Sequence, residues 1–190
     1  MDPDFRKPFK SDVQITIQIQ EVVDIVRGFT CDNVIFTGGE PLLQQAGIVE
    51  AMRVLRTASP RMTFEIETNG TLVPIPDLET FEPQYNVSPK LSNAEMRSEF
   101  CLVNDALRFF TASPRGTFKF VCSDEVDLAE VAALVRSRGL PRRRVLLSPE
   151  ATTAEQLAAK RLWLFEACVR LGFRYSDRLH VALFNTRRGV

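Results

Sequence analysis

Short apolar runs alternate along the chain with segments in which apolar residues recur every three or four positions. Such runs are typical of buried strands, and the wider spacing is typical of amphipathic helices. Because helices separate the predicted strands, the pattern favours an α/β fold with a mostly parallel sheet or an open barrel. The strands are predicted at residues 33–37, 62–67, 85–88, 117–122, 144–148 and 179–184.

Capping residues mark the predicted helices. Thr153, with Gln156 three positions later, forms a capping box for a long helix that ends at Gly172. Ser123 or Asp124 caps the helix before it. The predicted helices cover residues 17–27, where Thr16 is the cap, a stretch that ends near residue 58, the segment from Ser123 or Asp124 to residue 138, and residues 153–171. Residues 91–112 are ambiguous, with helical character around residues 100–109.

Unusual polar residues cluster where the predicted strands end. They occupy residues 37–41, 67–71, 88–90 and 148–150. In a parallel α/β sheet all the carboxyl ends of the strands open onto one edge, and ligands bind at that edge. A loop that begins at a proline or contains Asn-Gly is commonly only a turn, so a single loop of this kind does not indicate a ligand site. The four loops at one edge together do.

The first polar loop is the most informative. Gly38 and Gly39 allow a tight turn and a close approach to a ligand, and Pro41 can begin the next helix. A helix start favours anions, yet Glu40 places a carboxylate there. Glu40 would therefore repel a phosphate and attract a ligand ammonium, or it stabilises the helix dipole and does nothing else.

Two further polar residues lie in predicted strands. Lys119 stands between Phe118 and Phe120 and should point away from both, so it requires a partner or a polar cavity; we favour the cavity. His180 lies in the last predicted strand, where we expect a hydrogen-bonded structural histidine.

Composition narrows the class of protein. The 190 residues include 24 Lys and Arg against 24 Asp and Glu, so the formal net charge is zero. This balance argues against a nucleic-acid-binding footprint, and the length suits one domain. No apolar run approaches the ~20 residues of a membrane span, and the start has no secretory apolar region. We expect a soluble cytoplasmic protein with no membrane partner.

The cysteines limit the metal chemistry. Cys31, Cys101, Cys122 and Cys168 are far apart in the sequence, so no Cys-x-x-Cys motif exists. We expect reduced and mostly buried thiols. Because His180 is the only histidine, a zinc site would be hard to assemble locally.

The polar motifs together resemble a known family. Residues 38–41 read Gly-Gly-Glu-Pro, which marks a wide superfamily, and residues 86–92 read Asn-Val-Ser-Pro-Lys-Leu-Ser, which is much more specific. Four further segments match the same family: residues 67–71, 118–121, 145–150 and 180–190. Together, the six segments resemble the 7-carboxy-7-deazaguanine synthases, which are radical S-adenosylmethionine (SAM) enzymes of queuosine and 7-deazapurine biosynthesis.

The resemblance implies a partial (β/α) barrel of the radical SAM type that works as a homodimer in the cytoplasm. The family reaction converts 6-carboxy-5,6,7,8-tetrahydropterin to 7-carboxy-7-deazaguanine and ammonia, which makes the enzymes carbon–nitrogen lyases of a tRNA modification pathway. The implied cofactors are SAM, a [4Fe-4S] cluster and Mg²⁺, with a flavodoxin-type reductant as partner. The cofactors carry the difficult chemistry, and the protein positions them.

Carried over by motif, the resemblance also implies a set of binding residues, with no catalytic residue and no metal ligand in this chain. Thr37 should face the pterin, and Val190 stands where the family brings a terminal carboxylate to the substrate. The implied SAM-binding residues are Gly38, Gly39, Glu40, Ser88, Pro89, Lys90, Ser148, Pro149, Glu150 and Ala151.

One departure from the family pattern is serious. The family holds its cluster on a Cys-x3-Cys-x2-Cys type loop, which this chain lacks; Met1 stands where the last cluster cysteine would be, and Pro3 replaces the threonine tied to Mg²⁺. We expect residues 1–190 to form one N-terminally truncated domain that lacks the first barrel strand, which would leave residues 33–37 as an unpaired edge. The chain is either a truncated or mis-started synthase or a paralogue that lost the cluster.

Two further functions stay open. The alternative to the synthase is a non-catalytic protein that binds SAM or a pterin. A weaker hypothesis is a phosphate-binding module that uses Gly38 and Gly39, against which Glu40 argues.

We predict that this chain alone does not cleave SAM reductively, because the cluster cysteines are absent from its sequence. The measurement is 5′-deoxyadenosine release with dithionite after anaerobic reconstitution with iron and sulfide. Robust release would refute this prediction.

Overall fold

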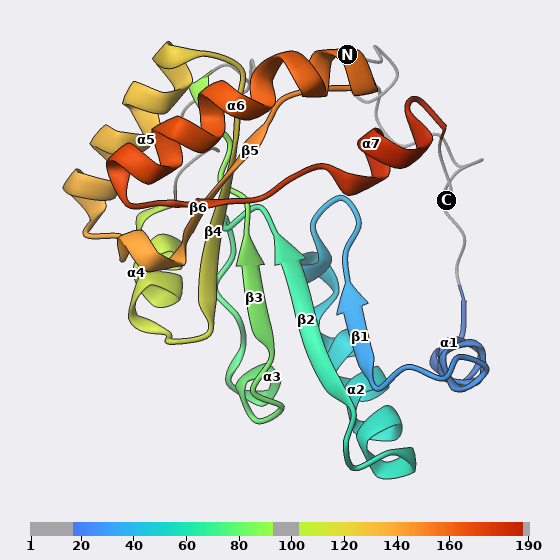
Figure 1. Ribbon diagram of the computed structural model, residues 1–190. Coiled ribbons are helices and arrows are strands. Elements are labelled where there is room, and N and C mark those ends of the chain that lie inside the picture. Colours follow the sequence, from blue (N-terminus) through green and yellow to red (C-terminus); the bar gives the residue numbers. More distant parts are fainter. Residues whose placement is uncertain (1–16, 93–102, 188–190) are drawn as a thin grey trace.

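The computed structural model describes residues 17–92 and 103–187. They form a six-stranded sheet in which every strand pairs in parallel with the next strand along the chain (Figure 1). This arrangement confirms the predicted α/β class with a parallel sheet and is that of a partial barrel. The strands are β1 (Asn33–Phe36), β2 (Thr63–Thr68), β3 (Gln84–Val87), β4 (Gly116–Cys122), β5 (Val145–Pro149) and β6 (Arg174–Tyr175).

Helices α5 and α6 begin and end where the capping residues predict. Thr153 and Gln156 form the capping box of α6, Asp124 caps α5 by accepting two backbone N–H bonds, and Gly139 and Gly172 end these helices at φ values of 67° and 70°. Helix α1 begins at Ile19 with Gln18 as its N-cap, so the predicted start at residue 17 after a Thr16 cap is wrong; Thr16 itself lies outside the described residues. The helices are α1 (Ile19–Arg27), α2 (Gln45–Ala58), α3 (Pro76–Glu79), α4 (Asn104–Ala112), α5 (Glu125–Arg138), α6 (Ala154–Leu171) and α7 (Leu179–Phe184), with short 3-10 turns η2 (Pro41–Gln44) and η5 (Arg142–Arg144).

One face of the sheet packs against the helices. Alternate residues of the strands, such as Phe64, Tyr85 and Phe118, are buried in a single cluster with apolar side chains of α2 to α6. Burial of this apolar surface is the main source of stability. Among the described helices, none has the length and apolar character that crossing a bilayer requires.

The last predicted strand is wrong, because residues 179–184 form helix α7. The sixth strand is β6, a pair of residues that hydrogen bonds beside β5, and the sequence analysis missed it. A six-residue apolar run fits either structure by periodicity, and long-range packing decides. Here Val181 is buried against Ala151 and Leu157, while His180 is exposed, so the expected structural histidine is also wrong.

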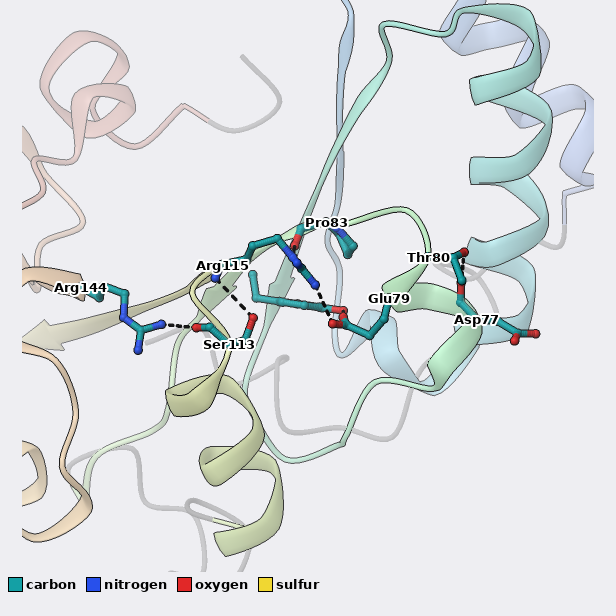
Figure 2. A network of polar contacts seen from close by, with 8 residues as sticks. Asp77, Glu79, Thr80, Pro83, Ser113, Arg115 and Arg144 are labelled. Atoms are coloured by element: carbon teal, nitrogen blue, oxygen red, sulfur yellow. Dashed lines mark hydrogen bonds and ion pairs between the residues drawn. The ribbon is translucent and has the colours of Figure 1, made fainter.

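A polar network closes the amino end of the strands (Figure 2). Glu79 on α3 accepts hydrogen bonds from the Tyr85 hydroxyl and from Arg115, whose Nη2 lies 2.6 Å from Oε2. Arg115 also donates to the Pro83 carbonyl at 3.2 Å, and Arg144 donates to carbonyl oxygens that include that of Ser113. Burial, and secondly the hydrogen bond to Glu79, raise the pKa of Tyr85 far above its usual range, so the phenol stays a proton donor.

We expect Glu79→Ala to lower the free energy of unfolding by about 2 kcal/mol, because it leaves the buried Tyr85 hydroxyl without an acceptor. Tyr85→Phe should cost less, since Arg115 then keeps its carboxylate partner. Urea unfolding measures both, with Glu82→Ala, an exposed neighbour, as the control. Equal stability of Glu79→Ala and the control would contradict the structural role of the network.

Candidate functional site

The four polar loops lie at one edge of the sheet. They follow β1, β2, β3 and β5, and the parallel pairing puts the carboxyl ends of all these strands on the same side (Figure 1). Loops at this edge can present polar groups to a ligand without disturbing the core.

Glu40 joins the first two loops. Its Oε1 accepts hydrogen bonds from the Leu42 N–H at 3.1 Å and from the Thr68 hydroxyl at 2.8 Å, and its Oε2 accepts from the Asn69 N–H at 2.8 Å. Glu40 therefore caps η2, as a helix-start carboxylate would, and also holds the loop after β2 in place. A carboxylate has about four acceptor sites, so these three bonds leave room for another donor.

Two glycines shape these loops. Gly38 has a φ of 136°, and a Cβ built there would meet nothing within 4 Å, so the backbone at this point is open to a ligand. Gly70 has a φ of 78°, and its Cβ would lie 2.7 Å from Cγ1 of Val87. The turn at Gly70 thus packs directly against β3 and requires glycine for two reasons.

The loop after β3 is held by its neighbours. The Ser88 N–H donates to the Thr68 carbonyl at 2.8 Å, and Pro89 is buried. Further on, Ser92 donates its backbone N–H and its hydroxyl, the latter at 2.6 Å, to Glu130 of α5. The exposed Lys90 side chain is therefore carried by a fixed backbone.

Ser148 at the end of β5 is the unusual residue of the site. Its side chain is fully buried, and its Oγ has no hydrogen-bond partner in the structure as described. By its register opposite Val121 it lies on the face of the sheet opposite to the core cluster. A buried hydroxyl without a partner costs roughly 1–3 kcal/mol, which makes this position a candidate contact for a ligand.

The residues after Ser148 are engaged with other parts of the chain. Pro149 is buried, and Glu150 pairs with Lys160 of α6 at 3.1 Å while its N–H donates to the Cys122 carbonyl. The Ala151 side chain is 1% exposed and packs under α7. Ala151 therefore offers little surface to a ligand.

The face of the sheet opposite to the core is lined with polar side chains that the sequence analysis did not combine. Glu65 accepts hydrogen bonds from the Asn33 amide at 3.0 Å and from the Asn86 amide at 2.7 Å, across three strands. Thr37 donates to Glu67 at 3.1 Å on the same face. The alternation of polar residues in β2 was the feature of the sequence that could have predicted this polar face. Only the register between the strands shows that these side chains meet.

Lys119 lies on this polar face as well. Its register beside Leu146, and that of Thr117 beside Asn86, place its half-buried side chain opposite to the core. This agrees with the predicted direction of the side chain. The cavity role proposed for it stays a prediction.

Three of the cysteines lie in the part of the chain that the structure describes. Cys31 is exposed before β1, and burial raises the pKa of Cys122 to about 12 and that of Cys168 to about 11, so both buried thiols stay protonated at neutral pH. Cys101 and Val190 lie outside the described residues. Within residues 17–92 and 103–187, no group of three His, Cys, Asp or Glu side chains could hold a metal ion.

We expect Gly70→Ala to destabilise the protein by more than about 2 kcal/mol, because the left-handed backbone and the close Val87 side chain both oppose a Cβ. Gly139→Ala is the matched control: its φ is 67°, but a Cβ there meets nothing within 4 Å. It should cost only the backbone strain of about 1 kcal/mol. Chemical denaturation that gives equal losses would show that the contact with Val87 is unimportant.

Curated relatives share one name. The chain is 40% identical over 160 residues to the 7-carboxy-7-deazaguanine synthase of Pyrobaculum aerophilum, covering 83% of this chain and 67% of the relative. It is 32% identical over 182 residues to that of Rhodopirellula baltica (90% and 69%) and 31% identical over 189 residues to that of Halobacterium salinarum (90% and 72%). No protein-family model matches the chain.

Proposed function

The chain belongs to the 7-carboxy-7-deazaguanine synthase family, and we propose that the carboxyl edge of its sheet binds SAM together with the pterin acid of the family reaction. Residues 17–92 and 103–187 supply one sheet with one main core, which supports treating the chain as a single radical SAM-like domain. The relatives are named as synthases, and the same activity is proposed for this protein.

The observation that carries the proposal is the unpartnered Ser148 hydroxyl. Proteins rarely bury a polar atom without a hydrogen bond, and those that do often use it at a binding site. Ser148 is the last residue but one of β5, the strand that leads into the third of the loops implied to bind SAM. A ligand hydroxyl or amine at this place would restore the missing bond.

The loop between β1 and η2 suits the amino-acid part of SAM. Glu40 is negatively charged and keeps an acceptor site, and the open backbone at Gly38 allows a close approach. Both features favour a ligand ammonium, so Glu40 joins the loops and can also receive the ligand. The sequence analysis left two alternatives for Glu40, attraction of a ligand ammonium and stabilisation of the helix start, and in this proposal Glu40 has both roles.

The pterin would lie against the polar face of the sheet. Thr37 and Glu67 are hydrogen bonded there, close to the carboxyl ends of β1 and β2. Ring N–H groups of a pterin need acceptors, and a carboxylate that already accepts one hydrogen bond can accept more. The substrate contact proposed for Thr37 fits this placement.

The iron–sulfur cluster is a different case, because the described residues do not fit it. A cluster needs cysteine thiolates that converge on one point. Cys122 and Cys168 are buried and protonated, and Cys31 is exposed at the opposite end of the sheet from the polar loops. Mg²⁺ likewise has no group of ligands in the described ranges. We derive no step through either group: the chemistry derived for these residues is binding and orientation.

We expect Ser148→Ala to weaken SAM binding about tenfold, the effect of losing one hydrogen bond of roughly 1.4 kcal/mol. The same change should leave the ligand-free protein equally or more stable, because it removes an unpartnered buried hydroxyl. Isothermal titration calorimetry and thermal unfolding measure the two quantities, and Ser137→Ala, on the exposed side of α5, is the control.

The combination of weaker binding and unchanged stability distinguishes a ligand contact from a structural role. Wild-type affinity in Ser148→Ala would remove this residue from the site. If the wild-type protein binds neither SAM nor the pterin acid at millimolar concentration, the proposed function fails.

A further inference from the structure

A cavity of about 320 Å³ lies between α4 and the end of α5, two helices on the same side of the molecule (Figure 1). Asn104, Arg108 and Thr111 of α4 line it, and Arg138 of α5 lines it from the other helix. Leu107, which belongs to the main core and is 4% exposed, supplies apolar surface. The volume suits a small ligand, since small-molecule sites measure roughly 300–1,000 Å³. This cavity is called the α4–α5 pocket below.

The pocket is separate from the proposed binding edge of the sheet. Helix α4 ends at Ala112, shortly before β4 begins at Gly116, and α5 ends at Arg138, shortly before β5 begins at Val145. The pocket therefore lies in the helical layer toward the amino ends of these strands, whereas the polar loops follow the carboxyl ends. A ligand here does not compete with one at the carboxyl edge.

The charges around the pocket are almost all positive. The chain as a whole is neutral, yet residues 104–117 and 131–149 hold seven arginines and no lysine against one acidic residue, Asp105. Arg115 and Arg144 donate to backbone carbonyls within the fold. The other five arginines are exposed. Such an uneven distribution attracts anions to this side of the molecule.

The pocket itself offers hydrogen-bond donors. Nη1 of Arg138 donates to Oδ1 of Asn104 at 2.6 Å, which places the guanidinium beside the amide group. A guanidinium has five N–H groups, so this bond leaves others for a ligand. The N–H groups of the Asn104 amide have no acceptor among the described residues. These donors lie close enough to one another to share the oxygen atoms of one anion.

Arg108 adds a second positive charge. Its side chain is 84% exposed, and its ion pair to Asp105 spans 3.8 Å. Such a surface pair contributes little, so a ligand with a higher charge can replace Asp105 as the partner. Among the described residues that line the pocket there is no carboxylate to repel an anion. The planar fork of arginine matches the spacing of phosphate oxygens.

We propose that the α4–α5 pocket binds a small phosphate monoester. Arg108, Arg138 and the Asn104 amide hold the phosphate, and the organic group packs against Leu107. The Thr111 hydroxyl already donates to the Leu107 carbonyl at 2.7 Å, so it offers an acceptor to a hydroxyl or amine of the ligand. This inference goes beyond the proposed function, because neither SAM nor the pterin acid carries a phosphate group.

Isothermal titration calorimetry of the full chain tests the site, with phenyl phosphate as the probe. We expect one saturable site, and phenol, which lacks the phosphate, should not bind. Arg138→Gln and Arg108→Gln should each raise the Kd about tenfold, because each removes a charged hydrogen-bond donor. Arg53→Gln is the matched control: Arg53 is exposed on α2, and the change in net charge is the same.

Two further measurements separate the proposal from its alternatives. Arg138→Lys keeps the charge but loses the fork, so it should also weaken binding, and a wild-type Kd in this variant would contradict the assigned contact. Saturating SAM should leave the Kd for phenyl phosphate unchanged, so this proposal and the proposed function can fail separately. Displacement of the probe by SAM would contradict a separate site.

Four other results would overturn the proposal. They are the absence of saturable phenyl phosphate binding, an equal loss in Arg53→Gln, wild-type affinity in both Arg108→Gln and Arg138→Gln, and equally tight binding of inorganic phosphate, which would leave no place for an organic group. Tighter binding of a single-stranded RNA oligonucleotide than of phenyl phosphate would assign this surface to nucleic acid and contradict the proposed ligand class.

Discussion

Parallel pairing of each strand with its successor is the constraint on which the rest of this structure depends. It aligns the carboxyl ends of β1, β2, β3 and β5, and therefore brings together four polar loops, of which the first, at Thr37, and the last, at Ser148, are about 110 residues apart in sequence. The same register separates the two faces of the sheet. One face takes the aromatic and branched side chains into the core, and the other collects polar groups such as Glu65 and Asn86.

The two ends of the sheet differ in how their polar groups are satisfied. At the amino end, Glu79, Tyr85 and Arg115 hydrogen bond to one another, which stabilises the fold and leaves little for a ligand (Figure 2). At the carboxyl end, Glu40 joins two loops but keeps acceptor capacity, and the Ser148 hydroxyl has no partner. An unsatisfied buried hydroxyl costs stability, so the Ser148 side chain supports a binding role at the carboxyl end.

Family membership and the geometry bear on different questions. The relatives identify the family, and the geometry shows which of the implied residues have an unpartnered polar group and which are packed against the rest of the chain. Ala151 is packed under α7, whereas Ser148 is unpartnered.

The sequence by itself determined the α/β class, β1 to β5 within one residue at either end, the caps at Thr153 and Gly139, and the family motifs, whereas it left the cap of α5 open between Ser123 and Asp124. These are local properties, since a cap or an apolar run acts within a few residues. Only the tertiary structure decided that residues 179–184 form a helix, that Glu40 bonds to Thr68 and Asn69, and that Glu65 lies between two asparagines. Each of these depends on which distant segment lies alongside, and neighbouring residues do not encode that choice.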